Sequence, residues 1–159
     1  MADSTDGQTA AAVAFLLAQL GEHAAAKFAE RIESLELTPA HAGVLRLVSV
    51  RPGCSQQVLA GALGALPSKV VALVDELQRR GLVERRRNPA DRRLHALHLT
   101  DEGEEMLRRV RSAAETHGAE LTRALDPEQR GHLADLLGRI AADQGLQPGV
   151  HPGYQRLRG

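Results

Sequence analysis

Apolar residues in the first part of the chain recur every three or four positions, the spacing of one helix face. They are Val13, Leu16, Leu17, Leu20, Ala24, Phe28, Ile32 and Leu35. The pattern predicts one long amphipathic helix, which we assign to residues 8–35. Thr38-Pro39 then predicts the start of a second helix, because threonine can cap the first turn of a helix and proline fits the first helical position.

Three shorter helices follow before the periodicity changes. The second ends at Arg51-Pro52-Gly53, and its apolar face carries His41, Val44, Leu45 and Val48. Ser55 caps the third and Gly64 ends it, with Val58, Leu59, Ala62 and Leu63 expected to point inward. The fourth, residues 67–80, begins at Pro67 and ends before Gly81; its expected buried residues are Val70, Leu73, Val74 and Leu77.

Alternation with a period of two predicts a β-hairpin over residues 82–100. Its strands are Leu82 to Arg86 and Leu94 to Thr100, and Leu97 and Leu99 share one face. Asn88-Pro89-Ala90-Asp91 joins them with residues typical of a type I turn.

Helical spacing returns in residues 101–143. Thr100 caps a fifth helix whose first turn is acidic and whose apolar stripe is Leu107, Val110, Ala114, His117, Leu121 and Leu125. Asp126 to Gln129 forms a capping box before a sixth helix, which carries Leu133, Leu136, Leu137 and Ile140. Residues 144–159 are rich in glycine and proline and predict an irregular tail.

This order of elements predicts a mainly α fold with a small β-hairpin wing. Residues 38–100 form a winged helix-turn-helix, in which residues 67–80 are the recognition helix and 82–100 the wing. The long first and fifth helices each carry an apolar stripe that a small domain cannot cover. Pairing two copies across a two-fold axis would bury both stripes, so residues 8–35 and 101–143 are expected to form a dimerisation domain.

Positive charge is concentrated in residues 79–93. This stretch holds seven arginines and two acidic residues, whereas the whole chain is neutral, with 20 basic and 20 acidic side chains. Such a polarised field attracts a polyanion to one place. Arginine at this density beside a turn indicates contact with nucleic acid phosphates or a groove.

Composition narrows the class of protein. The 159 residues suit one domain with an aliphatic core, since the chain has two Phe, one Tyr and no Trp. No apolar run reaches the roughly 20 residues that cross a bilayer, the N-terminus is not a secretory signal, and one cysteine favours a reducing, cytoplasmic setting. We find no nucleophile–base pair or phosphate loop, so we expect no enzyme and no cofactor.

Four segments occur in the order and spacing of a known family pattern. They are Leu37-Thr38-Pro39, LAGALG at 59–64, VDELQRRGLVER at 74–85, and DRR at 91–93 followed by LHLT at 97–100 and Gly103. On these residues the chain resembles the MarR family of bacterial transcription regulators. The resemblance implies a cytoplasmic, nucleoid-associated homodimer whose first, fifth and sixth helices intertwine. Each subunit would present its recognition helix to a major groove and its wing to a minor groove.

Candidate DNA contacts lie on the recognition helix and on the wing. The helix residues off its buried stripe are Pro67, Ser68, Lys69, Val71 and Ala72. Ser68 and Lys69 can donate to phosphate or guanine, and Val71 can meet a thymine methyl group. An ordinary exposed helix start is the alternative. Leu66 replaces a common capping serine and Ala72 a common arginine, which predicts thinner base readout than is usual in the family.

The wing candidates are Arg85, Arg86, Arg87, Asp91, Arg92 and Arg93. The family motif implies that Asp91 positions Arg93, which enters the minor groove. Arg85 to Arg87 alternate along a strand, so some are expected on phosphates and others in ion pairs with the acidic body. A solvated charged surface is the alternative.

Family members typically bind small aromatic or anionic effectors between the dimer helices and the DNA-binding lobe. Phe28 and His41 are candidate effector contacts here, with core packing as the alternative. Cys54 raises the alternative of a redox-sensing regulator, against that of a packed apolar residue. His95 and His98, three apart on a strand, point to opposite faces, and with the other histidines scattered we expect no metal site.

These observations predict a ligand-responsive repressor that binds a pseudo-palindromic operator as a homodimer. The half-sites should lie about 10 bp apart. The competing hypothesis is a winged-helix protein-interaction module that docks its basic hairpin on an acidic protein and does not bind DNA.

Overall fold

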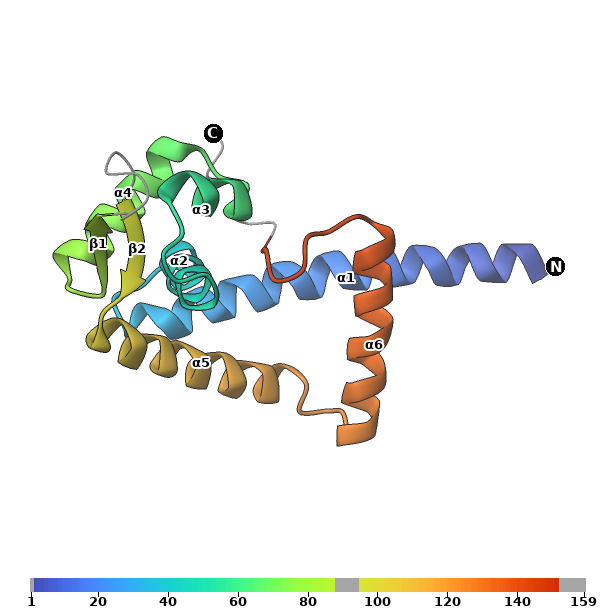
Figure 1. Cartoon of the computed structure of the whole chain (residues 1–159). Coiled ribbons are helices and arrows are strands. Elements are labelled where there is room, and N and C mark those ends of the chain that lie inside the picture. The colour runs from blue at the N-terminus through green and yellow to red at the C-terminus, as the bar shows by residue number, and fades with distance from the viewer. Residues whose placement is uncertain (1, 88–94, 152–159) are drawn as a thin grey trace.

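The computed structural model describes residues 2–87 and 95–151, as six helices and two strands. The elements are α1 (Ala2–Glu33), α2 (Pro39–Val50), α3 (Gln56–Leu63), α4 (Pro67–Arg79), β1 (Val83–Arg87), β2 (His95–Leu99), α5 (Asp101–Leu121) and α6 (Pro127–Asp143). Figure 1 shows α2–α4 and the hairpin gathered into one lobe, from which α1 and α5 extend. The mainly α fold with a β-hairpin is confirmed.

Four of the predicted helix starts are confirmed by their caps. The side chains of Thr38, Ser55, Thr100 and Asp126 each accept a hydrogen bond from the backbone N–H three residues later. These bonds satisfy donors that the first helical turn leaves without an intrahelical partner. Gly64, with φ +61°, ends α3, because glycine adopts this left-handed conformation without a steric penalty. Helix α1 begins at Ala2, earlier than the predicted residue 8.

The hairpin is antiparallel and joined to the lobe on both sides. Arg85 pairs with Leu97 and Arg87 with His95. The turn predicted at residues 88–91 lies outside the described residues. The other edge of β2 is bonded to the segment before α3: Gly53 N donates to Leu97 O at 2.8 Å, and Leu97 N donates to Cys54 O at 2.9 Å. Strand β2 is therefore hydrogen-bonded to β1 along one edge and to residues 53–54 of the lobe along the other.

An aliphatic core lies inside the lobe. Side chains with essentially no solvent exposure come from each of its elements and from the end of α1: Ile32, Val44, Leu45, Val48, Leu59, Leu63, Val70, Val74, Leu77, Val83 and Leu97. Leu107 and Val110 near the start of α5 join them. Burial of each such side chain stabilises the fold by roughly 1.5–3 kcal/mol, so the lobe has a core of its own.

The inward face of α3 differs from the prediction. Val58 is 48% exposed, whereas Ala60 is buried beside Leu59 and Leu63. At 100° per residue, Leu59, Ala60 and Leu63 lie within an arc of about 100°, whereas Val58 lies about 140° from Leu63 and about 160° from Ala60. The prediction counted apolar residues, but on a helix of eight residues the two buried leucines decide which face turns inward.

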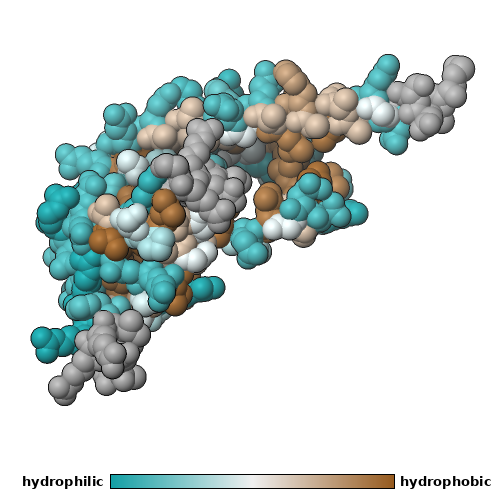
Figure 2. Space-filling view, turned by 90° about the horizontal axis from the view of Figure 1, so that it is seen from above, coloured by the Kyte–Doolittle hydropathy of each residue, from teal (hydrophilic) through white to brown (hydrophobic). Residues whose placement is uncertain are grey.

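Apolar side chains remain exposed on the parts of the chain that project from the lobe. They are Val13, Phe15, Leu16, Leu17 and Leu20 of α1, Leu121 of α5, and Leu133, Leu136, Leu137 and Ile140 of α6. Figure 2 shows apolar surface gathered on the projecting arm. Among the described residues, no single helix is both long and apolar enough to cross a membrane. Helices α3 and α4, which are bent by 114° relative to each other, would be long and apolar enough only when taken together. Several apolar residues of that pair are core residues of the lobe.

Gly103 joins the start of α5 to the base of the hairpin. A Cβ atom at this position would lie 1.9 Å from the carbonyl oxygen of Leu82, which also accepts a hydrogen bond from Thr100 N at 3.2 Å. The contact is with backbone, so a flexible side chain cannot move aside to relieve it. This explains why glycine occupies the last position of the LHLT…G motif.

We expect Gly103→Ala to lower the free energy of unfolding by about 2 kcal/mol, because the added methyl group overpacks a backbone contact. Urea unfolding followed by circular dichroism measures this. The matched control is Gly61→Ala in α3, where nothing lies within 4 Å of the added Cβ and helix propensity predicts a gain of up to about 1 kcal/mol. Equal stability of Gly103→Ala and the wild type would contradict the tight contact.

Candidate nucleic-acid interface

Helix α4 is oriented by the side that it buries. Val70, Val74 and Leu77 have no exposed surface, which turns the opposite side of the helix outward. Pro67, Ser68, Val71 and Ala72 are exposed, with Val71 at 39%, and Lys69 is partly exposed. The exposure predicted for the start of this helix is therefore found; whether these residues touch DNA remains a prediction.

The first turn of α4 lacks a capping side chain. Leu66 occupies the N-cap position with extended backbone angles and makes no side-chain cap bond. Pro67, the first helical residue, carries no N–H. The positive end of the helix dipole therefore meets solvent at Pro67 and Ser68, which is a favourable environment for an anionic oxygen.

The three arginines of β1 have different surroundings. The Arg85 guanidinium donates to the Asp75 carboxylate and to the Gln78 side-chain oxygen, both on α4, and its side chain is only 19% exposed. Arg86 pairs with Glu84 on its own strand, and Arg87 is exposed. As expected from their alternation, part of this positive charge is paired with acidic groups of the protein. Asp91, Arg92 and Arg93 lie outside the described residues.

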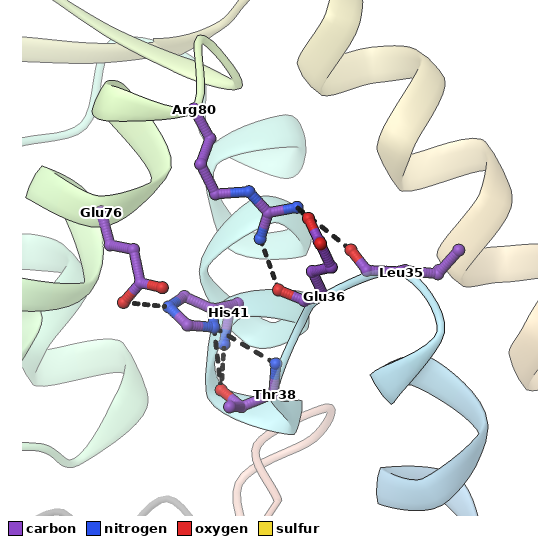
Figure 3. Close-up of polar contacts among 6 residues, drawn as sticks. All are labelled: Leu35, Glu36, Thr38, His41, Glu76 and Arg80. Atoms are coloured by element: carbon purple, nitrogen blue, oxygen red, sulfur yellow. Dashed lines mark hydrogen bonds and ion pairs between the residues drawn. The ribbon is translucent and has the colours of Figure 1, made fainter.

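His41 is a buried part of the connection between α1 and the lobe (Figure 3). Its Nδ1 lies 3.2 Å from Thr38 N and 3.0 Å from Thr38 Oγ1, which completes a capping box at the start of α2. Since Nδ1 accepts the Thr38 N–H, the proton of the neutral ring belongs on Nε2. That nitrogen lies 3.3 Å from Glu76 Oε2, close enough for attraction but poorly aligned for a hydrogen bond. Burial lowers the pKa of His41, and the Glu76 carboxylate opposes this shift.

Phe28 packs at the edge of the core instead of opening into a cleft. It is partly buried, and its ring lies 5.7 Å from the ring of His117 on α5, at a tilt of 46°. Whether Phe28 or His41 contacts an effector remains a prediction, and both residues have structural roles that require no ligand.

An open hollow lies between α1 and α5, further from the lobe. Its volume is about 750 Å³, and its lining includes Leu20, His23, Lys27, Arg31, His117 and Glu120. Arg31 forms an ion pair with Glu120 across the two helices, and its Nε is buried without a partner among the described residues. No pattern in the sequence pointed to this pair, because its members lie 89 positions apart.

Cys54 packs partly buried against the core at the edge of β2. Burial raises the pKa of its thiol, whereas a redox-sensing thiol needs a lowered pKa. In the part of the chain that the structure describes, no three His, Cys, Asp or Glu side chains are grouped to hold a metal ion.

Comparison with known proteins gives the family. A sequence profile of the MarR family matches residues 35–94, which begin just after α1, include α2, α3, α4 and β1, and end just before β2. A putative transcriptional regulatory protein for the hcr operon of Thauera aromatica is 33% identical over 141 residues, which cover 88% of this chain and 85% of the relative.

Solved structures agree with this match. The transcriptional repressor CouR, bound to a 23-mer DNA duplex, is 35% identical with a TM-score of 0.73, covering 85% of this chain and 96% of CouR. Wild-type apo MarR from E. coli has the same TM-score at 23% identity, over 80% of this chain and 94% of MarR, and so shows a shared fold. The chain therefore belongs to the MarR family of winged-helix proteins, which are transcription regulators and not enzymes.

Proposed function

We propose that this regulator binds double-stranded DNA as a homodimer, with α4 in the major groove and the β1–β2 hairpin at the minor groove. The observation that carries the proposal is the outward side of α4. Ser68, Val71 and Ala72 are exposed at its start, and β1 is attached to the same helix through Arg85. The 35% identity to CouR, a repressor solved on a DNA duplex, supports it.

Base readout by α4 is expected to be limited. Residues 67–72 supply one hydroxyl and one ammonium group, from Ser68 and Lys69, and Val71 suits a thymine methyl group. Arginine, asparagine and glutamine, which make bidentate contacts to bases, are missing from these six residues. We therefore assign a large share of the affinity to phosphate contacts and to the wing, where Arg87 is exposed and the motif residues Asp91, Arg92 and Arg93 follow.

The proposed dimer covers the exposed apolar stripes of α1, α5 and α6. Leu16 and Leu20 of α1 and Leu136 and Leu137 of α6 are each 38–53% exposed in the single chain. Burying a leucine fully stabilises by roughly 1.5–3 kcal/mol, so a second copy seated on both stripes would gain several such contributions. The two-fold symmetry of the dimer would also place two recognition helices on one duplex, one at each half-site.

We further propose that the protein represses transcription and responds to a small aromatic or anionic ligand. The hollow between α1 and α5 supports a ligand. Lys27 and Arg31 line it beside Leu20 and are paired with Glu30 and Glu120, but Arg31 Nε has no hydrogen-bond partner among the described residues and could donate to an anionic oxygen. A ligand that changes the separation of the two lobes would shift dimers away from the DNA-binding form.

Benzoate serves as a probe: it should lower DNA affinity in the wild type and not in Arg31→Gln. A reporter promoter that overlaps the binding site should be silenced by the protein, and stimulation would contradict repression.

Selection of bound molecules from a pool of random DNA duplexes tests the central proposal, and it requires no known operator. We expect enrichment of inverted repeats whose half-sites lie about 10 bp apart, with affinity that falls steeply as salt rises. A protein that enriches no duplex even at low salt would instead favour a protein-interaction module.

Alanine substitutions in β1 should separate phosphate contact from positioning. Arg87→Ala should reduce the slope of log Kd against log salt by about one ion, because an exposed arginine that neutralises a phosphate is lost. Arg85→Ala should leave the slope unchanged and weaken binding by up to about fivefold, since its guanidinium is held by α4. Fluorescence anisotropy titrations measure both. Equal slope changes would show that Arg85 also neutralises phosphate.

Leu137→Asp should convert the dimer to single subunits in sedimentation equilibrium, because it places a charge in the proposed apolar contact. Val58→Asp is the matched control: Val58 is similarly exposed but lies on α3, away from the stripes. Wild-type protein that sediments as one subunit would contradict the dimer.

A further inference from the structure

The last turn of α4 is attached to the connection between α1 and α2 (Figure 3). Arg80, the C-cap residue of α4, donates from Nη1 to the carbonyl oxygen of Glu36 at 2.5 Å and from Nη2 to that of Leu35 at 3.0 Å. Both carbonyls follow the end of α1 at Glu33, beyond the helix's own hydrogen-bond ladder. One planar guanidinium therefore bridges two consecutive backbone oxygens, which a lysine ammonium cannot do with the same geometry.

This attachment lies at the point where the chain changes direction. Glu36 has φ +56°, in the left-handed region that favours glycine, and its side chain is 89% exposed. A non-glycine residue in this conformation is strained by about 1 kcal/mol or more. Hydrogen bonds from Arg80 to the carbonyls of Leu35 and Glu36 hold the strained backbone in place.

A second contact is made one helical turn earlier. Glu76 and Arg80, four residues apart, lie on the same side of α4. Glu76 Oε2 lies 3.3 Å from His41 Nε2 at the start of α2, whereas Arg80 contacts the residues just after α1. The recognition helix is thus attached at two points to residues 35–41, which lead from α1 into the lobe.

We propose that Arg80 is a positioning residue that sets the angle between α4 and α1, and through it the half-site spacing that the dimer accepts. The inference rests on the proposed DNA-binding dimer, in which α1 belongs to the shared, central part and α4 to the part that reads DNA. Arg80 itself is at the end of α4 remote from Ser68 and is not proposed to touch DNA.

The size of the effect follows from the length of the helix. Helix α4 has 13 residues and is therefore about 20 Å long. A tilt of about 10° around its C-terminal end moves its N-terminal end by about 3 Å, which is close to the rise of one base pair, about 3.4 Å. Loss of the Arg80 contacts should therefore widen the range of half-site spacings that the dimer accepts by about one base pair.

The test compares Arg80→Met with Arg79→Met. Each variant removes one positive charge from the same end of α4 and retains a helix-forming side chain, but Arg79 is exposed. Binding is measured to the selected inverted repeat and to duplexes with one base pair added or removed between the half-sites. We expect wild type and Arg79→Met to discriminate strongly, and Arg80→Met to lose about fivefold or more of that discrimination. Arg80→Lys, which retains the charge, should restore it only in part.

A distance measurement tests, in the absence of DNA, whether Arg80 sets the angle between α1 and α4. Spin labels at Glu22→Cys on α1 and Ser68→Cys on α4, in a Cys54→Ser background diluted with unlabelled chains, report the α1–α4 distance within one subunit. Arg80→Met should broaden its distribution by about 3 Å, and Arg79→Met should not.

Two outcomes would overturn the inference. One is an unchanged distance distribution in Arg80→Met; the other is an equal loss of affinity on every duplex, which indicates a role in stability alone. Wild-type protein that binds no duplex would overturn the proposed function, and the distance measurement would still decide whether Arg80 sets the angle.

Discussion

The side chains that α4 buries determine which side chains it leaves for a partner. Val70, Val74 and Leu77 are fully enclosed by the lobe, and at roughly 1.5–3 kcal/mol each their burial outweighs any preference of the polar side for another orientation. The rotation of α4 about its axis is thereby set. The exposed start of the helix, the attachment of β1 through Arg85 and the contacts of Arg80 all depend on this one rotation.

Much of the fold could be predicted because its signals are local. Thr38, Ser55, Thr100 and Asp126 each cap a helix by bonding three residues ahead, and such bonds depend on a few adjacent residues. The capping role of His41 was missed because glutamate or glutamine is the usual partner at that position. Val58 was placed on the wrong face because the inward side of a short helix is decided by its neighbours in space.

The arginines show more clearly that contacts between elements distant in the sequence could not be predicted from it. The arginine-rich stretch predicted a cationic surface, but the structure distributes its members among different tasks. Arg80 holds backbone carbonyls, Arg85 holds Asp75, and Arg86 holds Glu84. Of the described arginines in this stretch, Arg79 and Arg87 are exposed and make no ion pair that the structure describes. Counting charges in the sequence therefore overstates the cations that face a polyanion, because their partners lie on other elements.

The exposed stripe on α6 has a consequence for how stability must be quoted. Every residue of this 17-residue helix is exposed, except Ala141, which is partly so, and an isolated helix near this length is only marginally stable in water. In the proposed dimer its order comes from the other chain, so the folding of α6 and the association of the two chains become a single equilibrium. The apparent stability would then rise with protein concentration, by about 1.4 kcal/mol per mole of dimer for each tenfold increase. A melting temperature reported for this protein has meaning only alongside the concentration at which it was recorded.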